Sequence, residues 1–166
     1  IYRGGTPLDI TIEGNLVNAY RMVFSKEKLY ICCAIISDNW DRTNLVTKYN
    51  PAMIMVDIEE ESARYFTFND AYSSSMCYIS HCFEMDKGVM FCGHKKGTFK
   101  HPVGKRNDLI ICGTILDGVE THSVHEFDSD TIFTMKDAIC RGNHLVICGM
   151  NNENGVNVGK ILDHKA

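Results

Sequence analysis

The segment 144–163, HLVICGMNNENGVNVGKILD, sets the pattern that the rest of the chain follows. An apolar run at 145–148 ends at Gly149, and a polar loop with an Asn-Gly turn leads into a second strand-like run at 156–162. Asn-Gly between two apolar runs is a strong signal for a β-hairpin. The apolar run recurs as VMFCG at 89–93, as LIICG at 109–113 and, more loosely, as LYICC at 29–33. The chain is therefore predicted to repeat one β-strand pattern.

The predicted repeating unit is a strand, a tight turn, an apolar strand, a variable loop, a third strand, a tight turn and a fourth strand. Turns within the first hairpin fall near residues 26, 86 and 142, a period of 56–60 residues. No segment has convincing helical periodicity, so the predicted class is all-β. The chain is expected to form one repeat domain over 1–166, with repeats at about 15–68, 76–127 and 132–163.

Two architectures fit this pattern, and other β-sandwiches remain open. The first is a β-propeller, in which about three four-stranded antiparallel blades pack face to face, so that inner strands are apolar on both sides. The second is a β-trefoil, which has three repeats of four strands, with the alternating run at 8–13 supplying the last strand. Because the second strand of each repeat is apolar throughout, we favour the propeller.

The strand pairs that end in Cys-Gly, at 89–93 and 145–149, resemble the degenerate blade repeats of bacterial β-propeller proteins. The Gly-His and Trp-Asp pairs typical of WD40 blades and the double glycine typical of kelch repeats do not recur from repeat to repeat: each occurs once, at 93–94, 40–41 and 4–5. The resemblance implies a ring of four to eight blades. We therefore expect either further blades in a longer parent chain or a head-to-tail homo-oligomer. It also implies export to the cell surface.

The composition is that of a globular protein, with 45% apolar and 23% charged residues and a net charge of −4. No apolar run approaches the roughly 20 residues that span a bilayer, so no membrane span is expected. Basic residues are scattered rather than gathered on one stretch, which argues against nucleic acid as a partner.

The eight cysteines leave two interpretations open, buried free thiols or a disulfide framework. Cys92, Cys112 and Cys148 each end an apolar run just before a glycine, where a small buried residue fits between packed sheets. We therefore favour buried thiols, which lean towards a reducing, cytoplasmic compartment. No pair of cysteines has Cys-x-x-Cys spacing and no set of cysteines and histidines has zinc-finger spacing, so no metal or other cofactor is predicted.

Histidines give weak signals. His122 and His125 are three residues apart on a predicted strand, so they should point to opposite faces and not share a metal. His94 and His101 lie by a basic loop at 94–107 that would repel a cation. No catalytic residues are predicted, because the cysteines look inert and the aspartates occupy turns.

The candidate contact site is the loop 37–52, with Asp38, Trp40, Asp41 and Arg42. An aromatic face beside acidic and amide groups suits a protein partner or a sugar ring. The alternative is that Trp40 caps the end of the sheet. The expected function is a non-enzymatic interaction or scaffold module that binds through its loops. The alternatives are a carbohydrate-binding module and part of an enzyme whose catalytic residues lie outside this segment.

Overall fold

The computed structural model describes eight segments of the chain, and every regular element in them is a β-strand. The described residues are 2–3, 6–7, 16–36, 49–68, 77–95, 109–126, 132–153 and 156–165. Apart from the short ladder β1 (Tyr2–Arg3) with β2 (Thr6–Pro7), eleven strands form three antiparallel sheets of four, four and three strands. The prediction of an all-β chain is confirmed for this part. No helix of membrane-spanning length and hydropathy occurs among these residues.

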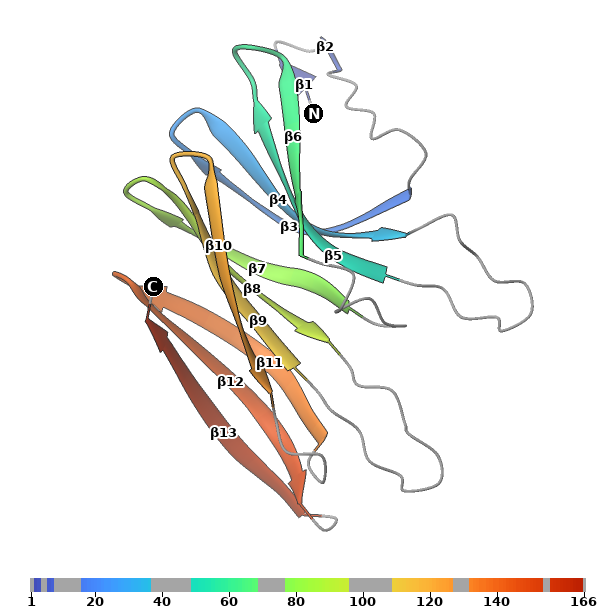
Figure 1. Cartoon of the computed structure of the whole chain (residues 1–166), viewed down its shortest axis with the longest axis vertical. Helices are drawn as coiled ribbons and strands as arrows, with labels where there is room; N and C mark the ends of the chain where they lie inside the picture. The colour runs from blue at the N-terminus through green and yellow to red at the C-terminus, as the bar shows by residue number, and fades with distance from the viewer. Residues whose placement is uncertain are drawn as a thin grey trace, which may run out of the picture.

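Each sheet is an up-and-down meander in chain order. Sheet 1 contains β3 (Leu16–Ser25), β4 (Lys28–Ile36), β5 (Tyr49–Asp57) and β6 (Ser62–Thr67). Sheet 2 contains β7 (Cys77–Met85), β8 (Gly88–Lys95), β9 (Leu109–Leu116) and β10 (Val119–Glu126). Sheet 3 contains β11 (Ile132–Arg141), β12 (His144–Glu153) and β13 (Val156–Lys165). The three sheets are stacked in this order (Figure 1).

Two-residue turns join most neighbouring strands, as the sequence predicts. Asp117 and Gly118 have φ values of 48° and 79°, the left-handed pair that a type I′ hairpin turn requires. Lys26 and Glu27 adopt the same pair of conformations, at 46° and 61°, without a glycine or asparagine. The turn after β5 is closed differently, because the Asp57 carboxylate accepts hydrogen bonds from the amides of Glu59 and Glu60, each at 3.1 Å.

The first strand of every sheet carries a β-bulge at the same place. The register shifts lie between Ala19 and Arg21, between Ile79 and His81, and between Met135 and Asp137. Arg21, His81 and Asp137, here called the bulge row, each stand five residues before the turn positions 26, 86 and 142. Each bulge-row residue also pairs with a cysteine of the second strand. The cysteines are Cys32, Cys92 and Cys148.

Two apolar layers hold the stack together. We call the face of each sheet that looks in the direction from sheet 1 to sheet 3 its front face, and the opposite one its back face. The front face of sheet 3 is therefore the face turned away from sheet 2. The front face of sheet 1 packs on the back face of sheet 2 through large side chains that include Met53, Phe68, Ile79 and Phe91. The front face of sheet 2 packs on the back face of sheet 3 through residues that include Met90, Ile110, Leu145 and Ile147. The core thus lies between the sheets and, as a third cluster that includes Cys33, Ala52 and Val56, on the back face of sheet 1.

Second strands differ in how they are covered. All of Gly88 to His94 in β8 is buried, and β4 is buried along nearly its whole length, as the uninterrupted apolar runs predict. In β12 burial alternates instead, because Leu145 and Ile147 face sheet 2 whereas Cys148 is exposed on the front face. The expectation that Cys148 is a buried residue between packed sheets is therefore wrong. Its register equivalents Cys32 and Cys92 are buried because another sheet covers them.

The glycine after Cys112 is required by close packing rather than by an unusual backbone angle. A Cβ at Gly113 would lie 2.9 Å from His122 Cβ, closer still to the Thr121 carbonyl oxygen, and against the ring of Phe91. Phe91 is the register partner of Gly113 and packs on Phe68, with ring centroids 4.8 Å apart. The missing side chain therefore makes room for an aromatic ring on the back face of sheet 2.

Substituting Gly113→Ala is expected to destabilise the protein by about 2–3 kcal/mol, since a methyl group is forced against backbone and a buried ring. Gly159→Ala is the matched control, because nothing lies within 4 Å of its added methyl group. Urea unfolding of the three proteins measures the difference. Equal urea midpoints for Gly113→Ala and the natural sequence would show that the neighbouring backbone and ring shift to accommodate the methyl group.

Thiol reactivity provides a second test of the stack. Six cysteines are buried, Cys140 is half-buried and Cys148 is exposed, and all eight are free. Burial raises the pKa of Cys33, Cys77 and Cys112 to about 12, which removes the reactive thiolate. A native chain diluted until it has the mass of a single chain, 18.7 kDa, and then titrated with a thiol reagent should show one fast-reacting group, lost in Cys148→Ser. Denaturation without reductant should release all eight thiols, and a smaller total would indicate disulfides.

Candidate functional site

The loop residues that the sequence singles out lie outside the described part of the chain. Asp38, Trp40, Asp41 and Arg42 fall within 37–48, and most of the basic loop falls within 96–108. The predicted strand at 8–13 and the Asn154-Gly155 turn are outside it as well. The roles proposed for these residues therefore stay predictions. The described residues contain three other features with functional potential: a cluster of a cysteine and two histidines, the bulge row, and exposed apolar surface at the ends of the stack.

The two histidines of β10 point to opposite faces of sheet 2, as their spacing predicts. His122 looks towards sheet 1, where its ring stands edge-on to Phe68 at 5.4 Å and its Nδ1 lies 2.6 Å from Glu120 Oε1. His125 looks towards sheet 3 and meets His164 of β13. The two therefore belong to different environments and share no ligand.

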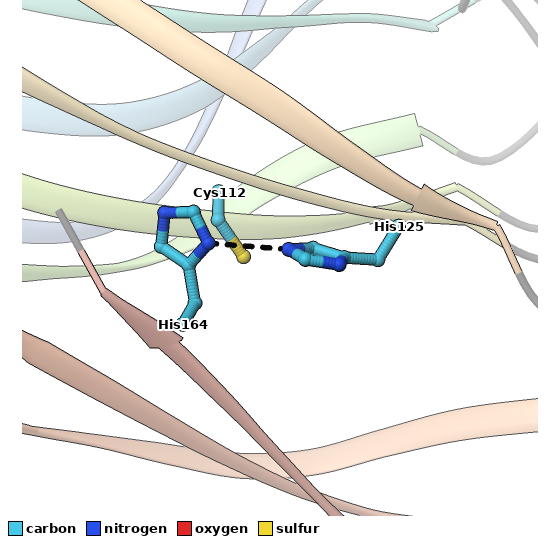
Figure 2. Close-up of side chains that lie close together, drawn as sticks. All are labelled: Cys112, His125 and His164. Atoms are coloured by element: carbon cyan, nitrogen blue, oxygen red, sulfur yellow. Dashed lines mark hydrogen bonds between the residues drawn. The ribbon is translucent and has the colours of Figure 1, made fainter.

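His125 lies in a cluster with Cys112 and His164, drawn in Figure 2. Register explains the first pair: Cys112 is opposite Ser123 and Ile110 is opposite His125, so Cys112 and His125 share the front face of sheet 2. His164 is opposite Leu145, whose side chain fills the layer between sheets 2 and 3. The cluster thus joins three strands and two sheets.

The potential ligand atoms of this cluster are close to one another. His125 Nε2 and His164 Nδ1 are 3.2 Å apart, and the rings stand nearly perpendicular, with an interplanar angle of 81°. The Cys112 sulfur and the two ring nitrogens all lie within 4.8 Å of one another. Cys112 is fully buried, whereas both histidines are half-buried near the edge of the stack.

The electrostatics of the cluster favour its neutral forms. Burial raises the pKa of the Cys112 thiol to about 12. Burial and the neighbouring His125 lower the pKa of His164, although Asp163 raises it. An imidazole that stays neutral keeps a lone pair for a metal ion, and a thiol gives one once its proton is lost. A thiol and two imidazoles form a donor set suited to zinc or copper.

Sequence reasoning missed this cluster because its members are 13 and 39 residues apart along the chain. Spacing rules for metal sites rest on ligands that lie close together within one short loop or hairpin, and these three residues do not. The alternation of β9 and β10 could have placed Cys112 and His125 on one face. Nothing in the sequence shows that β13 brings His164 to them, since that depends on how sheet 3 docks.

The bulge row forms a second feature, at the opposite edge of the sheets, where β3, β7 and β11 lie. His81 Nε2 is 3.5 Å from Asp137 Oδ1, and His81 Nδ1 is 2.8 Å from Ser80 Oγ. The Arg21 guanidinium lies 5.5 Å from the centre of the Phe83 ring, which in turn stacks on His81. Three sheets are therefore linked at this edge by one residue from each.

Burial first, and then Arg21, lower the pKa of His81, whereas Asp137 raises it. The net effect is a lowered pKa, so His81 is neutral near pH 7. The contact between His81 and Asp137 is then a polar contact and not an ion pair. An ion pair at their separation of 3.5 Å would need a protonated imidazole ring.

The third feature is apolar surface at the two ends of the stack. On the front face of sheet 3, Ile139 and Ile161 are 61% and 77% exposed, and Cys148 lies beside Ile161 in the register. On the back face of sheet 1, Met22 and Phe24 are 64% and 53% exposed. Large apolar side chains grouped in this way mark a binding surface more often than single ones do.

The chain matches no protein-family profile, no curated protein and no solved structure. Neither a family nor an activity therefore follows for it from a relative.

Lowering the pH is expected to destabilise the protein through His81. An unfolded histidine titrates near pH 6.5, whereas folded His81 takes its proton at lower pH. At pH values between the pKa of the unfolded and that of the folded histidine, the unfolded chain binds more protons than the folded chain, so the free energy of unfolding falls on acidification. His81→Gln should reduce the loss between pH 7.5 and 5.5, as measured by urea unfolding. Asp137→Asn should increase it, because the group that raises the pKa is gone. A loss unchanged in His81→Gln would exclude this histidine as its source.

Proposed function

We propose that the chain is a protein-interaction module of the β-propeller type, which associates head to tail through the exposed front face of sheet 3. The observation that carries the proposal is the exposure of Cys148 and its neighbours. Cys32 and Cys92, the equivalents of Cys148 in sheets 1 and 2, are buried under a following sheet, whereas Cys148 faces solvent. The front faces of sheets 1 and 2 are covered by another sheet, and we infer that the exposed front face of sheet 3 is covered by a binding partner.

Several features support the propeller type. Antiparallel meanders stack face to face, which is how propeller blades pack around their axis. The first strands lie near one another, shown by the stacking of Tyr20 on Tyr78 at 4.6 Å and by the contact of His81 with Asp137. The shared bulge position supports three copies of one unit. Burial of β4 and β8 on both faces favours a propeller over a trefoil, whose strands prefer alternation.

The proposed occupant of the front face is the back face of sheet 1 in a second copy. Both interfaces within the chain pair a front face with a back face, so a front-to-back contact continues the same packing. Each end carries exposed apolar side chains, Ile139 and Ile161 on sheet 3 and Met22 and Phe24 on strand β3 of sheet 1. The back face of sheet 1 over β4 and β5 is buried within the chain, so the proposed contact with the second copy runs along β3. A front-to-back contact is heterologous and closes into a ring when the rotation allows it. Two copies with three sheets each fall within the four to eight blades of closed propellers.

Charges on the exposed front face should disrupt this association. Ile139→Asp and Ile161→Asp each place a carboxylate in the proposed apolar contact, and both are expected to shift the protein towards the mass of one chain, 18.7 kDa. Val119→Asp is the control, because Val119 is 65% exposed but lies on sheet 2, away from both end faces. Light scattering after gel filtration, over a range of concentrations, gives the mass. A single-chain mass for the natural sequence at every concentration would overturn the proposal.

A further inference from the structure

We propose that Cys112, His125 and His164 form a zinc site that fastens the edge strand β13 of sheet 3 to sheet 2. The cluster is the one group of potential metal ligands found among the described residues. It draws one ligand from each of β9, β10 and β13, and Figure 2 shows the three side chains directed at one another. The inference is independent of the head-to-tail association, which concerns the far face of sheet 3.

The nitrogen separation fits a shared tetrahedral ion. Zn–N bonds are about 2.0–2.1 Å, and tetrahedral geometry then places two ligand nitrogens about 3.3 Å apart. His125 Nε2 and His164 Nδ1 are 3.2 Å apart. The same distance suits an N–H···N hydrogen bond between the rings, so the distance alone does not distinguish a metal from a proton between them. The Cys112 sulfur favours the metal, because a sulfur beside both nitrogens completes a set of metal ligands, whereas it adds little to a hydrogen bond between the two rings.

Cys112 is the one ligand of the three that must lose a proton to bind an ion. Binding of one Zn²⁺ therefore releases one proton to solvent when both imidazoles are neutral. The two half-buried histidines provide the route from the edge of the stack. Three protein ligands leave the fourth position for a water molecule.

The site would complete the attachment of sheet 3. At one edge of the stack, the polar contact between His81 and Asp137 links sheets 2 and 3. At the other edge, the hydrogen bond between His125 and His164 links the same two sheets. An ion at this point replaces a single hydrogen bond with three bonds across two sheets. Zinc is therefore expected to stabilise the folded chain, as any ligand of the native state does.

Cobalt is the probe for the site, because Co²⁺ takes the same ligands and its thiolate complexes absorb strongly. The metal-free, reduced protein carries Cys148→Ser throughout, which removes the exposed thiol. Titration with Co²⁺ should give a sulfur-to-cobalt charge-transfer band that saturates at one ion per chain and is abolished by Zn²⁺. Zinc at 100 times its dissociation constant should raise the melting temperature by about 5–10 °C.

Variants assign the ligands. Cys112→Ser should lose the band, and His164→Gln should weaken Co²⁺ binding by about 100-fold or more, since even supporting residues cost 10–100-fold. Cys92→Ala is the matched control, because Cys92 is equally buried in the same layer, directly opposite Cys112, and should keep the band. Should Cys112→Ser fail to fold, His164→Gln still decides, since its side chain lies half-buried on the last described strand. No band in the parent protein, a band kept in His164→Gln, or a band lost in Cys92→Ala would each overturn the assignment.

Discussion

The structure depends on one constraint: a sheet whose second strand is apolar on both sides must be covered on both sides. Burying apolar surface is worth roughly 25 cal/mol per Å², so a strand such as β8, buried from Gly88 to His94, is stable only between two other layers. Stacking three sheets front to back satisfies this for sheet 2. It leaves sheet 3 with one covered face, and the exposed Ile139 and Ile161 are the direct result. The proposed association and the fold thus follow from the same requirement.

The stack is held differently at its two edges. Where the first strands meet, bulges direct Arg21, His81 and Asp137 to the edge, and each sheet contributes one polar side chain. Where the later strands meet, a thiol and two imidazoles gather between sheets 2 and 3. Apolar contacts alone do little to fix the orientation of one sheet on the next, because the hydrophobic effect is not directional. Polar groups at the two edges therefore fix how one sheet sits on the next.

Local features of the fold were accessible from the sequence, whereas features that depend on docking were not. Asp117-Gly118 predicts its turn, and the runs at 89–93 and 109–113 predict buried strands, because turn chemistry and hydrophobicity act over a few residues. Cys148 belongs to the same pattern as Cys92 but is exposed, since its burial requires a sheet that sequence pattern cannot place. His164 gave no signal for a similar reason. Its importance arises only when β13 approaches β10.

The close packing at Gly113 has a consequence for how such a chain can diverge. Its Cβ position is occupied by backbone and by the Phe91 ring, and the Cβ position of Gly93 is likewise filled by the Tyr78 carbonyl and by Ile79. Cys92, which precedes Gly93, is under no such restriction, because other small apolar side chains fill the same space, whereas Cys112, which precedes Gly113, is a proposed zinc ligand. Related chains that keep this stack should therefore retain glycine at these two points while the residue at position 92 varies. In distant relatives, we therefore expect the most strongly conserved feature to be two glycines about twenty residues apart, each at the end of an apolar run.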